Sequence, residues 1–182
     1  GGLTRDIIFG IEPVHVLRTP YYFACVIGVV LIAYLISLLA PQIVKKILEP
    51  TTIFKSRREN FYLVLSDGLG LAAFTISGIF VTLLARVEPL WLWGPFFAFL
   101  TAVSGGILRD ILARRDQIMA LSGTLYGEWV FLWGGFFSYY IYKNAAVLSD
   151  QLITTGIFIT VAGVFISRLL GYIINLRNVF FK

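Results

Sequence analysis

The sequence is poor in the residues that build catalytic and metal sites. Its 182 residues include one cysteine, Cys25, inside an apolar run, and one histidine, His15, in a loop-like stretch. A single cysteine excludes an intrachain disulfide, and no cysteine–histidine cluster is present to bind a metal. The chain also contains no HExxH, GxGxxG or phosphate-loop motif. We therefore expect no enzyme activity, no metal site and no cofactor.

Charged residues are scarce as well. They make up 14% of the chain, against about a quarter in soluble globular domains. Hydrophobic residues make up 58%, and the mean hydropathy is +0.85. A soluble domain of this size could not bury so much apolar surface. The composition predicts an all-α integral membrane protein, and the lack of a basic stripe with interleaved aromatic residues excludes nucleic acid as a partner.

Hydropathy divides the chain into apolar segments of the length needed to cross a bilayer, about 20 residues. Tyrosine and tryptophan gather near the ends of these segments, as expected at membrane interfaces. The predicted spans are residues 21–39, 61–85, 90–112, 125–142 and 153–176.

The basic residues predict an orientation. Because successive spans alternate in direction, the loops fall on two sides of the membrane. Of the 15 Lys and Arg residues, 11 fall on the side of the 45–58 loop and the C-terminus, and 4 on the other. The positive-inside rule therefore places this loop and the C-terminus in the cytoplasm, with the protein in the cell (inner) membrane.

A repeat links the two halves of the chain. Residues 1–8 read GGLTRDII and residues 105–112 read GGILRDIL, and at the same offset Tyr22 matches Tyr126. An odd number of spans separates the copies, so they enter the membrane from opposite sides. This pattern predicts an inverted-topology repeat, an architecture that builds pathways near the bilayer midplane.

The repeat also predicts the domain organisation. A span and a half, about 45 residues, precedes the second glycine pair, and nothing precedes the first. We expect the natural protein to carry a corresponding N-terminal segment, giving three plus three plus one spans. Residues 1–58 would end the first repeat, 59–150 would form the second, and 151–182 would hold the last helix and the C-terminus.

Three segments resemble known membrane families: GGLTRDIIFGIEP at the start, DGLGLAAFTISG at 67–78 and TAVSGGILRDIL at 101–112. They are similar to the prokaryotic trimeric intracellular cation channels (the TRIC family) and to a related bacterial family of glycine transporters. The resemblance implies seven helices, of which the first and most of the second are absent here. It also implies a homotrimer, an ion pathway inside each subunit, and helices broken at Gly1-Gly2 and Gly105-Gly106.

The glycine pair after Ser104 allows two interpretations. Glycine in a helix interior costs about 1 kcal/mol per residue, so Gly105 and Gly106 invite an unwound turn. Its carbonyl oxygens and the Ser104 hydroxyl would then face a water-filled path. The alternative is close helix packing through small residues. Packing is also the prediction for two further small-residue rows, Ser66–Gly70–Ala73–Ser77 and Gly156–Thr160–Gly163–Ser167–Gly171.

Charges at membrane depth are the remaining candidates, because they are costly unless they face a cavity or a partner. Arg109 and Asp110 should point about 100° apart on a helix, and we expect them not to pair with each other. Asp67 and Glu128 are expected to line the path or to pair with an arginine. The alternative is that both lie at the membrane interface, because each is near the start of its span, and the arginines could also reach the interface. The candidate pathway residues are Gly1, Gly2, Arg5, Asp6, Asp67, Ser104, Gly105, Gly106, Arg109 and Asp110.

Two functions fit this sequence. The first is a channel for monovalent cations, potassium above all, with its pore inside each subunit of a trimer that contacts membrane lipid. Such a channel needs a continuous polar path with weak sites. The alternative is a secondary transporter of a small amino acid such as glycine, which needs a closed midplane site.

Overall fold

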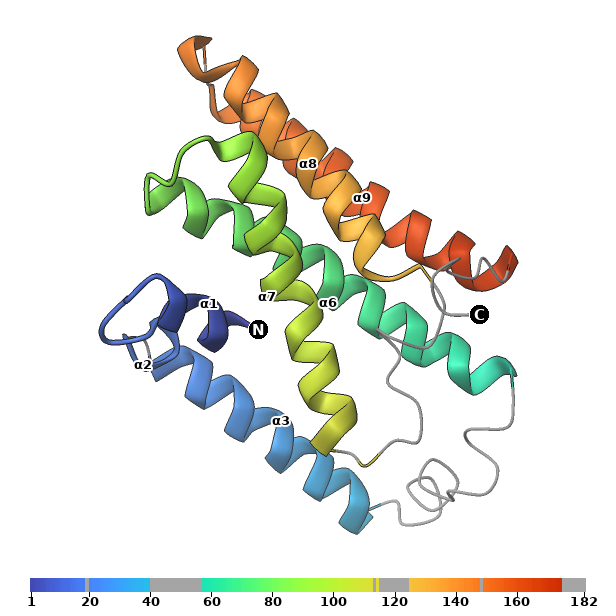
Figure 1. Ribbon diagram of the computed structural model, residues 1–182. Helices are drawn as coiled ribbons and strands as arrows, with labels where there is room; N and C mark the ends of the chain where they lie inside the picture. The colour runs from blue at the N-terminus through green and yellow to red at the C-terminus, as the bar shows by residue number, and fades with distance from the viewer. Residues whose placement is uncertain (19, 40–56, 113, 115–124, 148, 175–182) are drawn as a thin grey trace.

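The chain is helical wherever the structure describes it. The computed structural model describes residues 1–18, 20–39, 57–112, 114, 125–147 and 149–174, and contains no strand in these ranges (Figure 1). This confirms the predicted all-α membrane fold. The helices are α1 Gly2–Ile8, α2 His15–Arg18, α3 Pro20–Leu39, α6 Arg57–Leu84, α7 Leu90–Leu112, α8 Gly127–Lys143, a 3₁₀ turn Ala145–Val147, and α9 Asp150–Ile174.

Length and composition identify three of the helices as candidate membrane spans. Val64–Leu84, Leu90–Leu112 and Asp150–Ile174 are long and apolar enough to cross a bilayer. The 17 residues of α8 rise about 26 Å, slightly less than a typical hydrocarbon core of about 30 Å. The chain is therefore a multi-pass membrane protein, and every predicted span coincides with a helix.

Local sequence signals account for the ends of these helices. Ser149 precedes α9, and its hydroxyl accepts a hydrogen bond from the Leu152 amide at 3.3 Å, as an N-cap residue does. Asn144 follows α8, and its amide nitrogen donates to the Tyr140 carbonyl at 2.8 Å. Between α6 and α7 the chain turns sharply at Arg86, whose φ of 53° lies in the left-handed region.

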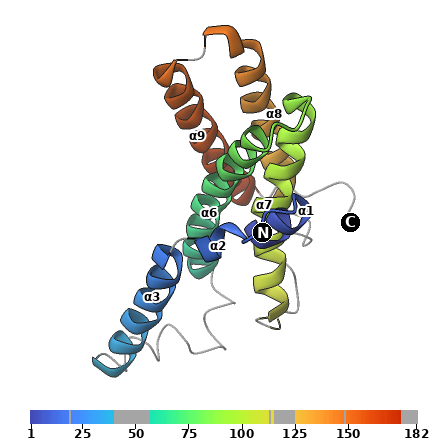
Figure 2. The same ribbon diagram turned by 90° about the vertical axis from the view of Figure 1, so that its left-hand side faces the viewer.

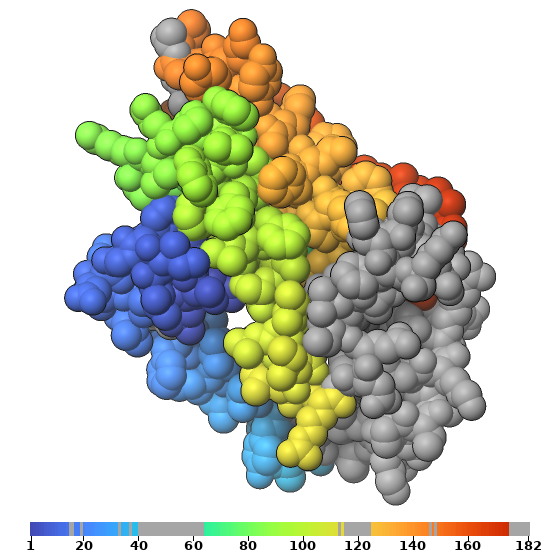
Figure 3. Space-filling view, viewed as in Figure 1, coloured from blue at the N-terminus to red at the C-terminus, as the bar shows by residue number. Residues whose placement is uncertain are grey.

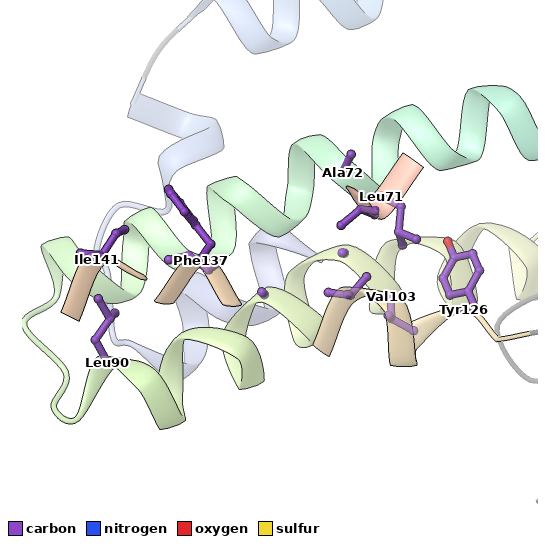
Figure 4. Packing of buried hydrophobic residues seen from close by; sticks show 12 residues of the cluster. Leu71, Ala72, Leu90, Val103, Tyr126, Phe137 and Ile141 are labelled. Atoms are coloured by element: carbon purple, nitrogen blue, oxygen red, sulfur yellow. The ribbon is translucent and has the colours of Figure 1, made fainter. Parts of the chain in front are cut away.

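Helices α6, α7, α8 and α9 form the core, each packing against at least two of the others (Figure 1). The buried apolar cluster includes Leu71 from α6, Val103 from α7 and Phe137 from α8 (Figure 4). Buried hydroxyls in this core bond to the carbonyl four residues earlier, as Thr75 does at 2.7 Å from the Leu71 carbonyl. Such internal bonds satisfy polar groups that lipid cannot.

Glycines allow the helices to approach closely. A Cβ atom built on Gly78 would lie 2.6 Å from the Cα of Ala98, so α6 and α7 cross there almost backbone to backbone. A Cβ on Gly163 of α9 would lie 2.4 Å from the Trp133 ring of α8. The packing prediction for the α9 row of small residues is therefore confirmed.

Helix α3 stands apart from this core. It leads away from α2 and extends beyond the four-helix group (Figures 1 and 2). Its apolar side chains are exposed around the whole helix rather than along one stripe, as expected of a helix that lipid surrounds. These exposed residues include Tyr22, Phe23, Val26, Val29, Leu31, Ile32 and Leu35.

The predicted break in α7 is wrong. The helix runs without interruption from Leu90 to Leu112, through Gly105 and Gly106. Each glycine costs about 1 kcal/mol, but backbone groups released into an apolar environment cost more. A Cβ atom on Gly106 would lie 2.8 Å from the Tyr126 hydroxyl. Gly106 therefore makes room for a tyrosine. The first glycine pair lies at the beginning of α1, where Gly1 is the N-cap.

Candidate functional site

A partly open cavity of about 280 Å³ lies between α6 and α7. Its lining follows one stripe on each helix. On α6 the stripe is Asp67, Gly70, Leu71 and Phe74, and on α7 it is Ala102, Gly105, Gly106 and Arg109. Both sets have the spacing i, i+3, i+4, i+7, which places residues on a single helix face. Ser66 and Tyr126 complete the lining.

Asp67 is the acidic residue in the cavity lining. Its side chain is only 6% exposed. One oxygen, Oδ1, accepts hydrogen bonds from Arg109 Nη1 at 2.7 Å and from the Tyr126 hydroxyl at 3.2 Å. The other oxygen, Oδ2, is buried and has no hydrogen-bond partner among the described residues. A carboxylate with acceptor capacity left over inside a protein is suited to bind a donor from a ligand.

Arg109 supplies the opposite charge. Its Nε donates to Asp110 Oδ1 at 2.9 Å, and its side chain remains 39% exposed. The expectation that these neighbours would not pair is therefore wrong. Their Cα–Cβ bonds do diverge, but arginine carries Nε at the end of a flexible three-carbon stem that reaches around the helix. The expected pairing of Asp67 with an arginine is confirmed.

Tyr126 lines the cavity, and Arg168 lies behind this tyrosine. Tyr126 is 2% exposed, and Figure 4 shows it at one end of the buried cluster. The guanidinium carbon of Arg168 lies 4.8 Å from the centroid of the tyrosine ring, a cation–π contact. Arg168 is 1% exposed and also donates to the Leu125 carbonyl at 3.5 Å. The charged residues in and behind the cavity therefore have formal charges that sum to zero: Arg109, Arg168, Asp67 and Asp110.

The first copy of the repeat forms a similar pair in different surroundings. Arg5 donates to Asp6 Oδ1 through Nε at 2.9 Å and through Nη2 at 2.7 Å. Its Nη1 donates to the Ser77 hydroxyl on α6 at 3.2 Å. Arg5 and Asp6 are 4% and 1% exposed, and neither lines the cavity. This copy joins α1 to α6.

The other candidates lie beside the cavity rather than in its wall. Gly1 packs against the Thr101 carbonyl of α7, and Gly2 begins α1. The Ser104 hydroxyl donates to the Leu100 carbonyl of its own helix. Glu128 accepts from the Tyr126 amide at 3.0 Å, so it caps the start of α8.

Sequence reasoning did not identify Ser66, Gly70, Phe74 and Tyr126 as lining residues. Ser66 and Gly70 belong to the row predicted to pack, but they line the cavity, while Ala73 of that row is exposed. The prediction for this row is therefore wrong. A signal was present, because Asp67 opens a helical stripe and Tyr126 is the repeat partner of Tyr22.

Comparison with known proteins gives a match that covers the residues that line the cavity. Residues 64–143 match a protein-family model. That family is described as Glycine transporter. The match spans most of α6 with α7 and α8, includes Asp67, Arg109 and Tyr126, and ends before α9. No curated protein and no solved structure matches the chain. The family match and the apolar helices together indicate a membrane protein related to transport.

Proposed function

We propose that this protein is a secondary transporter of a small zwitterionic amino acid, glycine being the smallest. The observation that carries the proposal is the presence of both charges in one intramembrane cavity. Asp67 has acceptor capacity for an ammonium group, and Arg109, which is 39% exposed and lines the cavity, supplies a positive charge that attracts a carboxylate. Charged residues at membrane depth commonly mark a substrate pathway. The description of the matching family supports the same substrate.

The charge balance of the site favours a zwitterion over a bare cation. Asp67 and Asp110 are matched by Arg109 and Arg168, so a net neutral ligand adds no charge to a buried cluster. A potassium channel is the second candidate, because the buried Asp67 oxygen would also attract a cation. However, α7 is unbroken, so its carbonyl oxygens remain within the helix instead of forming a selectivity ring.

Uptake by purified protein in liposomes tests this function. We expect saturable uptake of labelled glycine, inhibited by excess unlabelled glycine, and no unitary currents in planar bilayers. Liposomes without protein give the background uptake. Excess free arginine, which carries a net positive charge, should not inhibit glycine uptake because the site is neutral overall. Unitary potassium currents without saturable glycine uptake would reverse the assignment and favour the channel.

We also propose that the protein is a homotrimer in the inner membrane with a cytoplasmic C-terminus. The loop that carries this orientation, residues 45–58, falls largely outside the described residues. In a Cys25→Ser background, a cysteine introduced as Ser56→Cys should resist an impermeant thiol reagent applied to intact cells. Glu88→Cys, in the exposed α6–α7 turn, is the matched control and should react. Labelling at position 56 alone would reverse the orientation, and a purified protein mass other than three chains would exclude the trimer.

A further inference from the structure

Helix α9 lies outside both repeats and outside the matched segment, yet it contributes to the wall behind the cavity. It packs against α6 and α8 (Figure 2). Its Arg168 is 1% exposed, and the side chain of this arginine lies next to Gly68 on α6. An arginine buried this deeply in a membrane helix is costly, which makes it a candidate for a functional role.

A short series of contacts leads from Arg168 to the ligand-binding carboxylate. The Arg168 guanidinium lies over one face of the Tyr126 ring, 4.8 Å from its centroid. The Tyr126 hydroxyl sits above Gly106, where a side chain would not fit. From there it donates to Asp67 Oδ1 at 3.2 Å. The tyrosine is thus held between α9 and α7 and fixes one oxygen of Asp67.

The surroundings of Tyr126 come from three helices. Its hydroxyl meets Asp67 on α6 and Gly106 on α7, and its ring meets Arg168 on α9. Tyr126 is 2% exposed. Helix α9 therefore contributes a cation to a tyrosine site that is otherwise built by α6 and α7.

We propose that Arg168 is a positioning residue of the transport site. It holds Tyr126 so that the hydroxyl of this tyrosine occupies Asp67 Oδ1 and leaves Oδ2 for the ammonium group of the substrate. The inference rests on the proposed function for the identity of the substrate. The contacts among Arg168, Tyr126 and Asp67 do not depend on the proposed function. The second test below also does not depend on it, because it does not measure transport.

The first test is a double-mutant cycle on the glycine KM. Tyr126→Phe and Arg168→Met should each raise KM about five- to tenfold, the effect of one lost hydrogen bond. Because both changes act through the same bond, the double variant should stay within about twofold of either single variant. Arg168→Lys keeps a cation over the ring and should rescue most of the loss. Multiplied effects in the double variant would overturn the proposal. If Arg168→Met does not fold, a wild-type KM for folded Tyr126→Phe would overturn it as well.

The second test measures the charge of the cavity without transport. In a Cys25→Ser background, Gly70→Cys places the reactive thiol on the cavity wall, and the rates of a cationic and an anionic methanethiosulfonate reagent are compared. If Arg168 positions Asp67 through Tyr126, then Tyr126→Phe, which changes no formal charge, should lower the cationic-to-anionic rate ratio, and Arg168→Lys should keep it near wild type. If Arg168 acts only as a positive charge, Tyr126→Phe should leave the ratio unchanged while Arg168→Met raises it, and this outcome contradicts the proposal. Wild-type protein that fails to transport glycine but shows the expected ratios would overturn the proposed substrate alone.

Discussion

Asp67→Asn is expected to lower the kcat/KM of glycine uptake by about a hundredfold or more. The substitution keeps the shape of the side chain but removes the charge that would bind the substrate's ammonium group. It also removes the charge that pairs with Arg109 Nη1, while the bond from Arg109 Nε to Asp110 remains. Charge-assisted hydrogen bonds of this kind are worth about 1.5–3 kcal/mol each, so losing two lowers transport by at least two orders of magnitude.

The control for this variant is Asp150→Asn. Asp150 is an exposed acidic residue in the first turn of α9, away from the cavity lining. Its substitution should leave uptake within about twofold of wild type, since exposed charges near a helix end contribute at most about 1 kcal/mol. Uptake by Asp67→Asn at the wild-type rate would show that the substrate does not bind at this cavity.

Gly70→Leu is expected to abolish most transport while the protein remains folded. A Cβ atom on Gly70 would meet nothing within 4 Å, so the leucine side chain can extend into the cavity without displacing the protein. Filling this space should reduce uptake at least tenfold. Stability should be unchanged or slightly higher, because leucine favours a helix by somewhat under 1 kcal/mol relative to glycine.

Two further glycines provide matched comparisons for Gly70→Leu. Gly135 on α8 also has open space around its Cβ position but does not line the cavity, so Gly135→Leu should transport normally. Gly78→Leu should instead lose folded protein, because its Cβ would lie 2.6 Å from Ala98. Uptake and thermal unfolding measured on all three variants separate a blocked cavity from damaged packing. Normal uptake by folded Gly70→Leu would remove the cavity from the pathway.

Hydropathy and spacing predict much of this architecture, because the membrane restricts a spanning chain to helices of suitable length. The Asp67–Arg109 pair could also be anticipated, since two opposite charges at membrane depth gain most by meeting. The cavity follows less directly. Its stripes on α6 and α7 are visible in the sequence, but small residues with this spacing equally predict a packing seam. Only the crossing of the two helices at Gly78 decides which faces meet.

Three other features could not be predicted from the sequence, for different reasons. The pairing of Arg109 with Asp110 depends on how a long side chain curls around its helix, which residue spacing does not specify. The role of Tyr126 depends on Arg168, 42 residues further along the chain. The unbroken course of α7 is a matter of energy, because two glycines weaken a helix by about 2 kcal/mol. Leaving the backbone unsatisfied in an apolar environment costs more.

The two Arg–Asp pairs bear on how a duplicated segment diverges. In both copies arginine Nε donates to the following aspartate at 2.9 Å. The shared Arg-Asp sequence therefore forms the same local hydrogen bond in both places. Beyond that bond the copies differ: Arg5 is sealed against Ser77, whereas Arg109 reaches Asp67 at the cavity. The pair in the first copy is buried, whereas Arg109 of the second copy lines the cavity. A substitution that is tolerated at Arg5 or Asp6 therefore does not predict what Arg109 or Asp110 will accept, even though residues 1–8 and 105–112 have similar sequences.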